Sequence, residues 1–101
     1  MTQPRWTALR VEFLSRIGHI AGTDHIELDI AKEETVGSML ERLCDKFGDK
    51  FRQVVLDEKS SCVRQQILIM VNGDNIFIRE GLLTRLSKED VLQIVEAVGG
   101  G

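Results

Sequence analysis

The sequence predicts an α+β domain in which one main helix packs on a mixed sheet of four to five strands. Two stretches near the start alternate apolar and polar residues, as half-buried strands do. Residues 36–47 change to the spacing of an amphipathic helix, and the second half returns to short apolar runs separated by turns. The 101 residues, 43% of them hydrophobic, fit one domain with a single core between two layers.

The first two strands are predicted from alternation. Residues 9–13 place apolar side chains on one face and Arg10 and Glu12 on the other, and residues 26–30 repeat this pattern. Residues 16–24 between them are rich in glycine and small polar residues, which is typical of a loop. We therefore expect an antiparallel pair joined by a loop.

The main helix is predicted over residues 36–47. Its apolar positions recur at helical spacing and are Val36, Met39, Leu40, Leu43, Cys44 and Phe47. Thr35 is placed to cap the first turn, Lys46 lies in the last turn, and Gly48 is placed to end the helix.

The second half of the chain is predicted to complete the sheet. Residues 48–66 are mostly polar, with room for a short helical turn over residues 49–53. The continuous apolar run 67–71 predicts a central strand covered on both faces. Asn72-Gly73 then favours a tight hairpin into a short return strand over residues 76–78. The final strand is predicted over residues 91–98.

Three glycines follow the final strand directly: Gly99, Gly100 and Gly101. Glycine has no Cβ, so such a tail is thin, bendable and able to enter a narrow channel. We divide the chain into an extension, residues 1–7, a domain, residues 8–98, and a flexible glycine tail, residues 99–101. The functional interpretation is that the carboxylate of Gly101 is the reactive group; the alternative is a frayed terminus.

Composition disfavours several classes of function. The net charge is −3 and no basic stripe interleaved with aromatics occurs, which disfavours nucleic-acid binding. The longest apolar run, residues 67–71, is too short to cross a membrane, and the first residues lack the apolar core of a signal peptide. Two cysteines make no disulfide framework, so we expect a reducing, cytoplasmic setting.

Side chains that could carry chemistry within the domain are few. His19 and His25 lack partners at ligand spacing, so they predict surface histidines and no metal site. Cys44 lies on the apolar face of the helix and is predicted to be buried. Cys62 stands among polar residues near Arg64, where a thiolate relay is an open alternative. Without a phosphate-binding loop or a catalytic triad, the chain is not expected to be an enzyme in its own right.

Several short pieces, in this order and spacing, resemble one family. They are the turn Val71-Asn72-Gly73 after a strand, the turn Lys88-Glu89-Asp90 before the last strand, and the glycine end. Over residues 9–101 the chain resembles the ubiquitin-like β-grasp sulfur carriers: the small subunit of molybdopterin synthase, the thiamine-pathway carrier and the small archaeal modifiers. It departs from the family in having three glycines and, at residues 95–98, no aromatic residue or prolines.

The resemblance implies a carrier that is a co-substrate of other enzymes. An E1-like enzyme would use ATP to adenylate the carboxylate of Gly101, which would then become a thiocarboxylate, with Gly99 and Gly100 as the stem. A second enzyme, such as the large subunit of molybdopterin synthase, would accept the sulfur for molybdopterin or a related cofactor. No cofactor would be bound. Alternatives are a modifier joined to lysines through Gly101, and a non-covalent interaction domain with an inert tail.

The last strand also predicts a partner-binding surface. Because its residues alternate, one set enters the core and the other faces outward. Leu92 and Ile94 are bulkier and are predicted to point inward. Val95 and Ala97 would then face outward and, with Val98, form a docking surface beside the tail.

Overall fold

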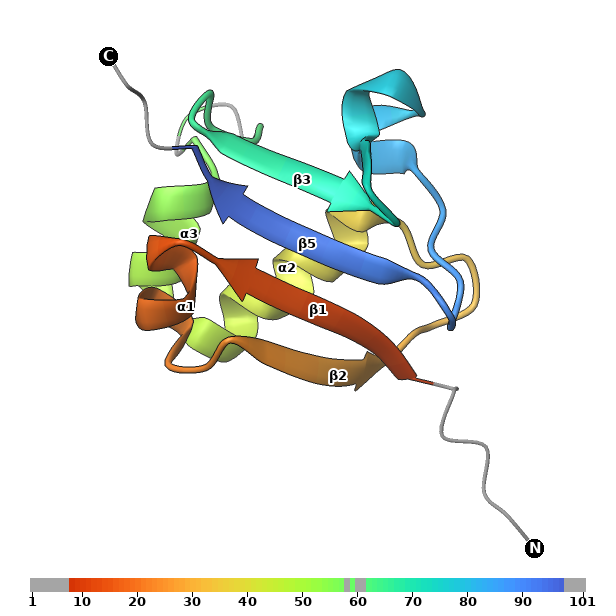
Figure 1. Cartoon of the computed structure of the whole chain (residues 1–101), viewed down its shortest axis with the longest axis horizontal. Helices are drawn as coiled ribbons and strands as arrows, with labels where there is room; N and C mark the ends of the chain where they lie inside the picture. Colours follow the sequence, from red (N-terminus) through yellow and green to blue (C-terminus); the bar gives the residue numbers. More distant parts are fainter. Residues whose placement is uncertain (1–7, 58, 60–61, 98–101) are drawn as a thin grey trace, which may run out of the picture.

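The structure is a computed structural model that describes residues 8–57, 59 and 62–97 (Figure 1). The predicted extension, residues 1–7, lies outside the described residues, as do Val98 and the glycine tail, residues 99–101.

One mixed sheet carries the domain. Its strands are β1 (Ala8–Leu14), β2 (His25–Asp29), β3 (Ile67–Val71), β4 (Asp74–Asn75) and β5 (Val91–Glu96), in the order β2-β1-β5-β3-β4. β5 lies between β1, to which it is parallel, and β3, to which it is antiparallel. The last strand in the sequence is therefore central in space, and the predicted α+β class with a mixed sheet is confirmed (Figure 1).

Helices cover one face of this sheet and leave the other open (Figure 1). They are α1 (Arg16–Ala21), α2 (Val36–Phe47) and α3 (Asp49–Val55), and two single-turn 3₁₀ helices follow β4, η2 (Ile76–Ile78) and η3 (Gly81–Leu83). No helix in the described part of the chain is long and apolar enough to cross a membrane.

The core lies between the sheet and the helices. Leu92 and Ile94 of β5 are fully buried, which confirms their predicted inward direction. Beneath the end of β1, Phe13 meets Phe47 and Phe51 edge to face, with ring centroids 5.4 and 5.9 Å apart. Edge-to-face packing is the favoured arrangement of aromatic rings, so these three residues form a well-packed aromatic cluster.

The main helix begins and ends where the sequence predicts. Its start is a capping box: Thr35 Oγ1 accepts a hydrogen bond from the Ser38 N–H at 3.1 Å, and Ser38 Oγ accepts one from the Thr35 N–H at 3.0 Å. Its last turn is followed by Gly48, whose φ of 95° favours glycine. The short helix suggested for residues 49–53 is present as α3, which runs on to Val55.

Glu34, just before α2, is almost completely buried, at 3% exposure. Its carboxylate accepts hydrogen bonds from the Ala31 N–H at 2.9 Å, from Arg42 Nη1 at 2.7 Å and from the Ser38 hydroxyl. Burial raises the pKa of Glu34, but these donors outweigh it, so the net pKa is lowered. The ionised carboxylate therefore fastens the turn before α2 to the helix.

The loop predicted over residues 16–24 is wrong in part, because residues 16–21 form α1. Ile17 is fully buried, and a helical turn lets it enter the core while the chain reverses towards β2. Gly18 reflects close packing, since a Cβ there would lie 3.2 Å from the backbone oxygen of Phe13. Gly18, which suggested a loop, therefore allows a short helix to pack closely against the end of β1.

Three further expectations for the second half are wrong. β3 is covered on one face only, because the helices all lie on one side: Leu68 is 37% exposed while Ile67 and Ile69 are buried. The return strand is Asp74–Asn75, and residues 76–78 form η2, whose first turn is capped by the Asn75 side chain. The last strand ends at Glu96 instead of Val98.

Candidate functional site

The candidate site is the end of β5, where the glycine tail follows in the sequence. β5 is bonded to strands on both sides, and the backbone N–H of Ala97 still donates to the oxygen of Gln66 at 2.7 Å. Regular hydrogen bonding therefore holds the chain up to Ala97. The residues after Ala97 therefore follow a strand that is paired on both sides.

A charged pair also fastens the end of this strand. The guanidinium of Arg16, in α1, donates through Nε to Glu96 Oε1 at 2.6 Å and through Nη2 to Glu96 Oε2 at 2.9 Å. The hydrogen bond from Arg16 lowers the pKa of Glu96, against a smaller effect of burial. Because the contact is bidentate, it fixes direction as well as distance between α1 and the last residue of β5.

Three apolar side chains from three adjacent strands gather on the open face at this end. Val95 of β5 is paired in register with Leu14 of β1 on one side and with Leu68 of β3 on the other. Leu14 and Leu68 are each 37% exposed, and Val95 is half-buried. We call Leu14, Leu68 and Val95 the tail-end cluster. It presents an apolar surface at the end of β5, after which the tail follows in the sequence.

The structure places part of the predicted docking surface. Val95 faces outward as expected, and Ala97 is half-buried two residues further along. Val98 and the tail residues Gly99, Gly100 and Gly101 lie outside the described residues. The roles of all these residues in partner binding and activation stay predictions.

Sequence reasoning missed Leu14, Leu68 and Arg16. Leu68 stands within a run that is apolar throughout, so alternation could not show which of its residues face outward. Arg16 and Glu96 are 80 positions apart in the sequence and meet only because β5 pairs with β1. The one available signal was the spacing of Leu14 in β1, where it follows the outward positions Arg10 and Glu12.

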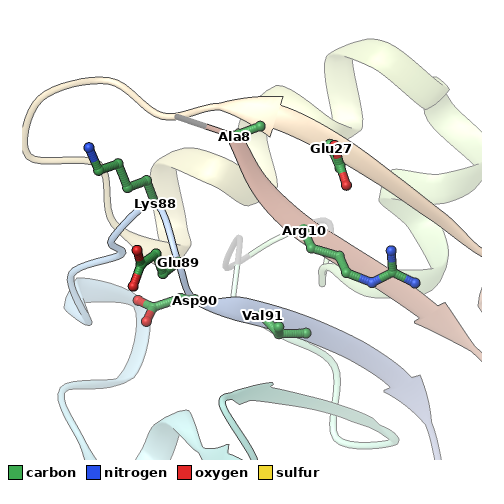
Figure 2. A pocket seen from close by; sticks show the side chains of 7 residues that line it. All are labelled: Ala8, Arg10, Glu27, Lys88, Glu89, Asp90 and Val91. Atoms are coloured by element: carbon green, nitrogen blue, oxygen red, sulfur yellow. The ribbon is translucent and has the colours of Figure 1, made fainter. Parts of the chain in front are cut away.

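The other end of the open face holds a shallow polar groove (Figure 2). It is lined by Ala8, Arg10, Glu27, Lys88, Glu89, Asp90 and Val91. The Asp90 carboxylate already accepts from Asn72 Nδ2 and the Ser87 N–H, both at 2.8 Å, and Arg10 Nε donates to Glu12 at 2.7 Å. The Asp90 bonds hold the turn before β5 and the Arg10–Glu12 pair lies on the face of β1, so these groups of the groove already serve the fold.

The remaining chemistry-bearing side chains are scattered. Within residues 8–57, 59 and 62–97, no three His, Cys, Asp or Glu residues gather in a way that could hold a metal ion. His25 Nδ1 lies 2.8 Å from Asp24 at the surface. Cys44 is buried as predicted, and burial raises the pKa of its thiol, which suits packing. Cys62 is exposed.

Comparison with solved structures identifies the same architecture in several proteins. The small archaeal modifier protein 1 from Methanosarcina acetivorans is 28% identical, with a TM-score of 0.80 over 94% of this chain and 97% of that one. A putative molybdopterin converting factor, subunit 1, from Pyrococcus furiosus is 21% identical, with a TM-score of 0.73 over 91% and 99% of the two chains. A chain of the BexX/CysO complex of Amycolatopsis orientalis is 22% identical, with a TM-score of 0.73 over 93% and 100%.

No curated protein matches the sequence significantly. The sequence model of the ThiS family does match, and it spans residues 11–101, which is most of the chain. The TM-scores of 0.73 to 0.80 show that these solved structures share the fold of this chain, which confirms the predicted ubiquitin-like β-grasp fold. The chain therefore belongs to the ThiS family of ubiquitin-like β-grasp sulfur carriers and small modifiers.

Proposed function

We propose that this chain is a sulfur carrier whose Gly101 carboxylate is adenylated by an E1-like enzyme and then converted to a thiocarboxylate. One observation carries the proposal. The central strand of the sheet ends beside an exposed apolar cluster, and the glycine tail follows it closely in the sequence. Docking and tail delivery would thus use one end of one strand, which is what a tail-presenting carrier needs.

The chemistry requires two displacements. An oxygen of the Gly101 carboxylate attacks the α-phosphorus of ATP, pyrophosphate leaves, and an acyl adenylate forms. A sulfur nucleophile, in the simplest case hydrosulfide, then adds to the carbonyl carbon, and the bond from that carbon to the adenylate oxygen breaks as AMP leaves with the oxygen and its electron pair. The products are a terminal thiocarboxylate, AMP and a proton. ATP is used by the activating enzyme, and the carrier itself binds no cofactor in this scheme.

The domain would act by positioning. The Ala97–Gln66 hydrogen bond and the Arg16–Glu96 pair fix the direction in which the tail leaves the sheet. Burial of apolar surface drives protein association, so the tail-end cluster would supply the docking energy. Gly99 and Gly100 would let the tail enter a narrow site because they have no side chains. A sulfur-accepting enzyme of cofactor biosynthesis, such as a molybdopterin synthase large subunit, would use the same surface in the cytoplasm.

A second role, as a protein modifier, shares the activation step. The structure that is 28% identical is described as a small archaeal modifier protein, which favours this role. Here a lysine amine would displace AMP from the acyl adenylate, forming an isopeptide bond to Gly101. Conjugates would retain the whole chain and no sulfur.

The test is the intact mass of the full chain after incubation with ATP, its cognate E1-like enzyme and sulfide. A sulfur carrier gains the mass of one oxygen-to-sulfur exchange, located in the peptide that ends at Gly101. A mass gain of AMP alone, with lysine-linked adducts when a target protein is added, would favour the modifier role. If neither product forms, both roles are contradicted, and a non-covalent interaction domain is the function that is left.

Two variants serve as controls. Removal of Gly101 should abolish both the adenylate and the thiocarboxylate while leaving the thermal unfolding curve unchanged, because the core is complete without the tail. Leu83→Ser changes an exposed residue at the other end of the molecule and should react like the original chain. Sulfur transfer by the shortened chain would overturn the proposal.

A further inference from the structure

Among the described residues, the most exposed large apolar side chains lie away from the end of β5. Phe77, Ile78 and Leu83 are 74%, 73% and 71% exposed. They stand on η2 and η3, which contact each other beyond β4. Figure 1 shows this region, in cyan and light blue, at the opposite end of the sheet from the end of β5. We call Phe77, Ile78 and Leu83 the far-end cluster.

The backbone fixes this exposure. The Arg79 N–H donates to the Ile76 oxygen at 2.9 Å, and the Leu83 N–H donates to the Glu80 oxygen at 3.0 Å. Each single-turn helix has one residue that points inward: Ile76 in η2 is 1% exposed, and Leu82 in η3 packs on the core. The neighbouring apolar residues cannot also turn inward without breaking these bonds, so the far-end cluster remains at the surface.

The exposed area indicates a weak protein contact. With side chains of this size, the far-end cluster exposes on the order of 400 Å² of apolar surface, which is large for a monomer of this length. A stable interface buries about 800 Å² on each partner. The far-end cluster would therefore form the centre of an interface that needs a polar rim to complete it, and the resulting affinity would be low.

The rim carries both signs of charge. Arg79 and Asp74 pair at 2.9 Å beside η2, and Arg85 lies 3.8 Å from Glu33 near η3. A partner whose surface carries only one sign of charge would be repelled by about half of the charged residues in this rim. A second copy of the chain carries the same two pairs, so a two-fold axis that sets Arg79 of one copy against Asp74 of the other would match opposite charges around two facing apolar centres. The net charge of −3 is small enough not to prevent such pairing.

We propose that two copies of the chain associate reversibly through their far-end clusters. Because the far-end cluster and the tail-end cluster lie at opposite ends of the sheet, such a dimer leaves both tails free for an activating enzyme. The dimer does not depend on the proposed sulfur chemistry, so each can fail without the other.

The test is sedimentation equilibrium of the full chain over a wide concentration range, in the presence of a reductant. The reductant is needed because Cys62 is exposed and could join two copies by a disulfide. We expect the mass to rise from 11.4 kDa towards twice that value, with a dissociation constant between about 10 µM and 1 mM. The matched variants are Phe77→Ser, in the far-end cluster, and Leu68→Ser, in the tail-end cluster.

Phe77→Ser should weaken association at least tenfold, and Leu68→Ser should leave it unchanged. Dilution of isotope-labelled protein should shift amide signals in residues 74–85 and not at the end of β5. A thermal unfolding curve like that of the original chain would show that Phe77→Ser is folded. A mass that stays at 11.4 kDa up to about 1 mM, or a dimer that Phe77→Ser does not weaken, would overturn the proposal.

Discussion

The tail-end cluster and the far-end cluster differ in how the fold holds them. Leu14, Leu68 and Val95 stand on three paired strands, and the residue before each of them enters the core. The far-end cluster stands on two single-turn helices that pair with no strand. Its side chains are about twice as exposed as Leu14 and Leu68.

This difference shows two ways of leaving apolar surface in water. In the sheet, an outward residue is partly covered by its cross-strand neighbours, so the surface is flat and its layout is set by strand register. On the 3₁₀ helices no cross-strand neighbour covers the side chains, and about 25 cal/mol of potential stabilisation is lost for every Å² left in water. The first arrangement suits precise docking beside the tail, and the second suits a small adaptable contact.

The largest difference in unfolding free energy is expected between variants of two phenylalanines. Phe51 lies in the aromatic cluster beneath the tail end and is fully buried, whereas Phe77 is 74% exposed. Phe51→Ala should lower the free energy of unfolding by about 3–5 kcal/mol, through lost burial and the cavity left behind. Phe77→Ala should change it by less than about 0.5 kcal/mol. Urea unfolding measures both, and equal losses would contradict the different packing of the two ends.

Substitutions in the two clusters should also differ in their effect on the affinity for the activating enzyme. Val95→Asp places a charge at the centre of the tail-end cluster, which should weaken binding to the activating enzyme at least tenfold. Phe77→Asp should leave that affinity unchanged. Titration calorimetry with the E1-like enzyme measures both variants. An unfolded Val95→Asp protein would show that this half-buried position belongs to the core. Loss of binding by Phe77→Asp would show that the activating enzyme docks at the far-end cluster and not at the tail-end cluster.

A smaller effect is expected where η3 packs on α2. A Cβ added at Gly37 would lie 3.2 Å from the backbone oxygen of Leu82 and 3.4 Å from its Cβ. Because the backbone oxygen cannot move without η3, Gly37→Ala should lower the free energy of unfolding by about 1 kcal/mol despite the better helix propensity of alanine. Amide shifts should be confined to α2 and residues 81–84. A stabilised variant would mean that η3 adjusts freely.

The smallest effect is the pH dependence of the stability that Glu34 contributes, near the end of the sheet that carries η3. The backbone oxygen of Glu34 accepts from the Leu86 N–H at 2.9 Å, so Glu34 supports the segment that follows η3. Its pKa is lowered in the folded state from an ordinary value of 4.5. A lowered pKa contributes stability that is present above the ordinary value and is lost as pH falls through the folded pKa.

The difference in unfolding free energy between the original chain and Glu34→Gln should therefore shrink as pH falls from about 6 to 3. Urea unfolding over that range measures it. The buried phenylalanines do not titrate, so Phe51→Ala should show no such trend. A difference that grows towards low pH would mean that the pKa of Glu34 is raised instead.

Much of the scaffold could be predicted from the sequence because the signals are local. The spacing of residues 36–47 and the cap at Thr35 predicted α2, and alternation predicted β1 and β2. The bulk of Leu92 and Ile94 predicted that they point inward. The thin end of the chain is also a property of the sequence, since three consecutive glycines need no partner to be narrow.

Tertiary structure alone decided which residues surround the end of β5. Leu14 and Leu68 flank Val95 only because β5 inserts between β1 and β3, and Arg16 reaches Glu96 for the same reason. It also decided that Gly18 lies within a packed helix and that residues 76–78 form a 3₁₀ turn in which Phe77 and Ile78 are exposed. Such features depend on which distant segments meet. Local propensity carries no information about that, because the free energy that settles it comes from burial in the assembled core.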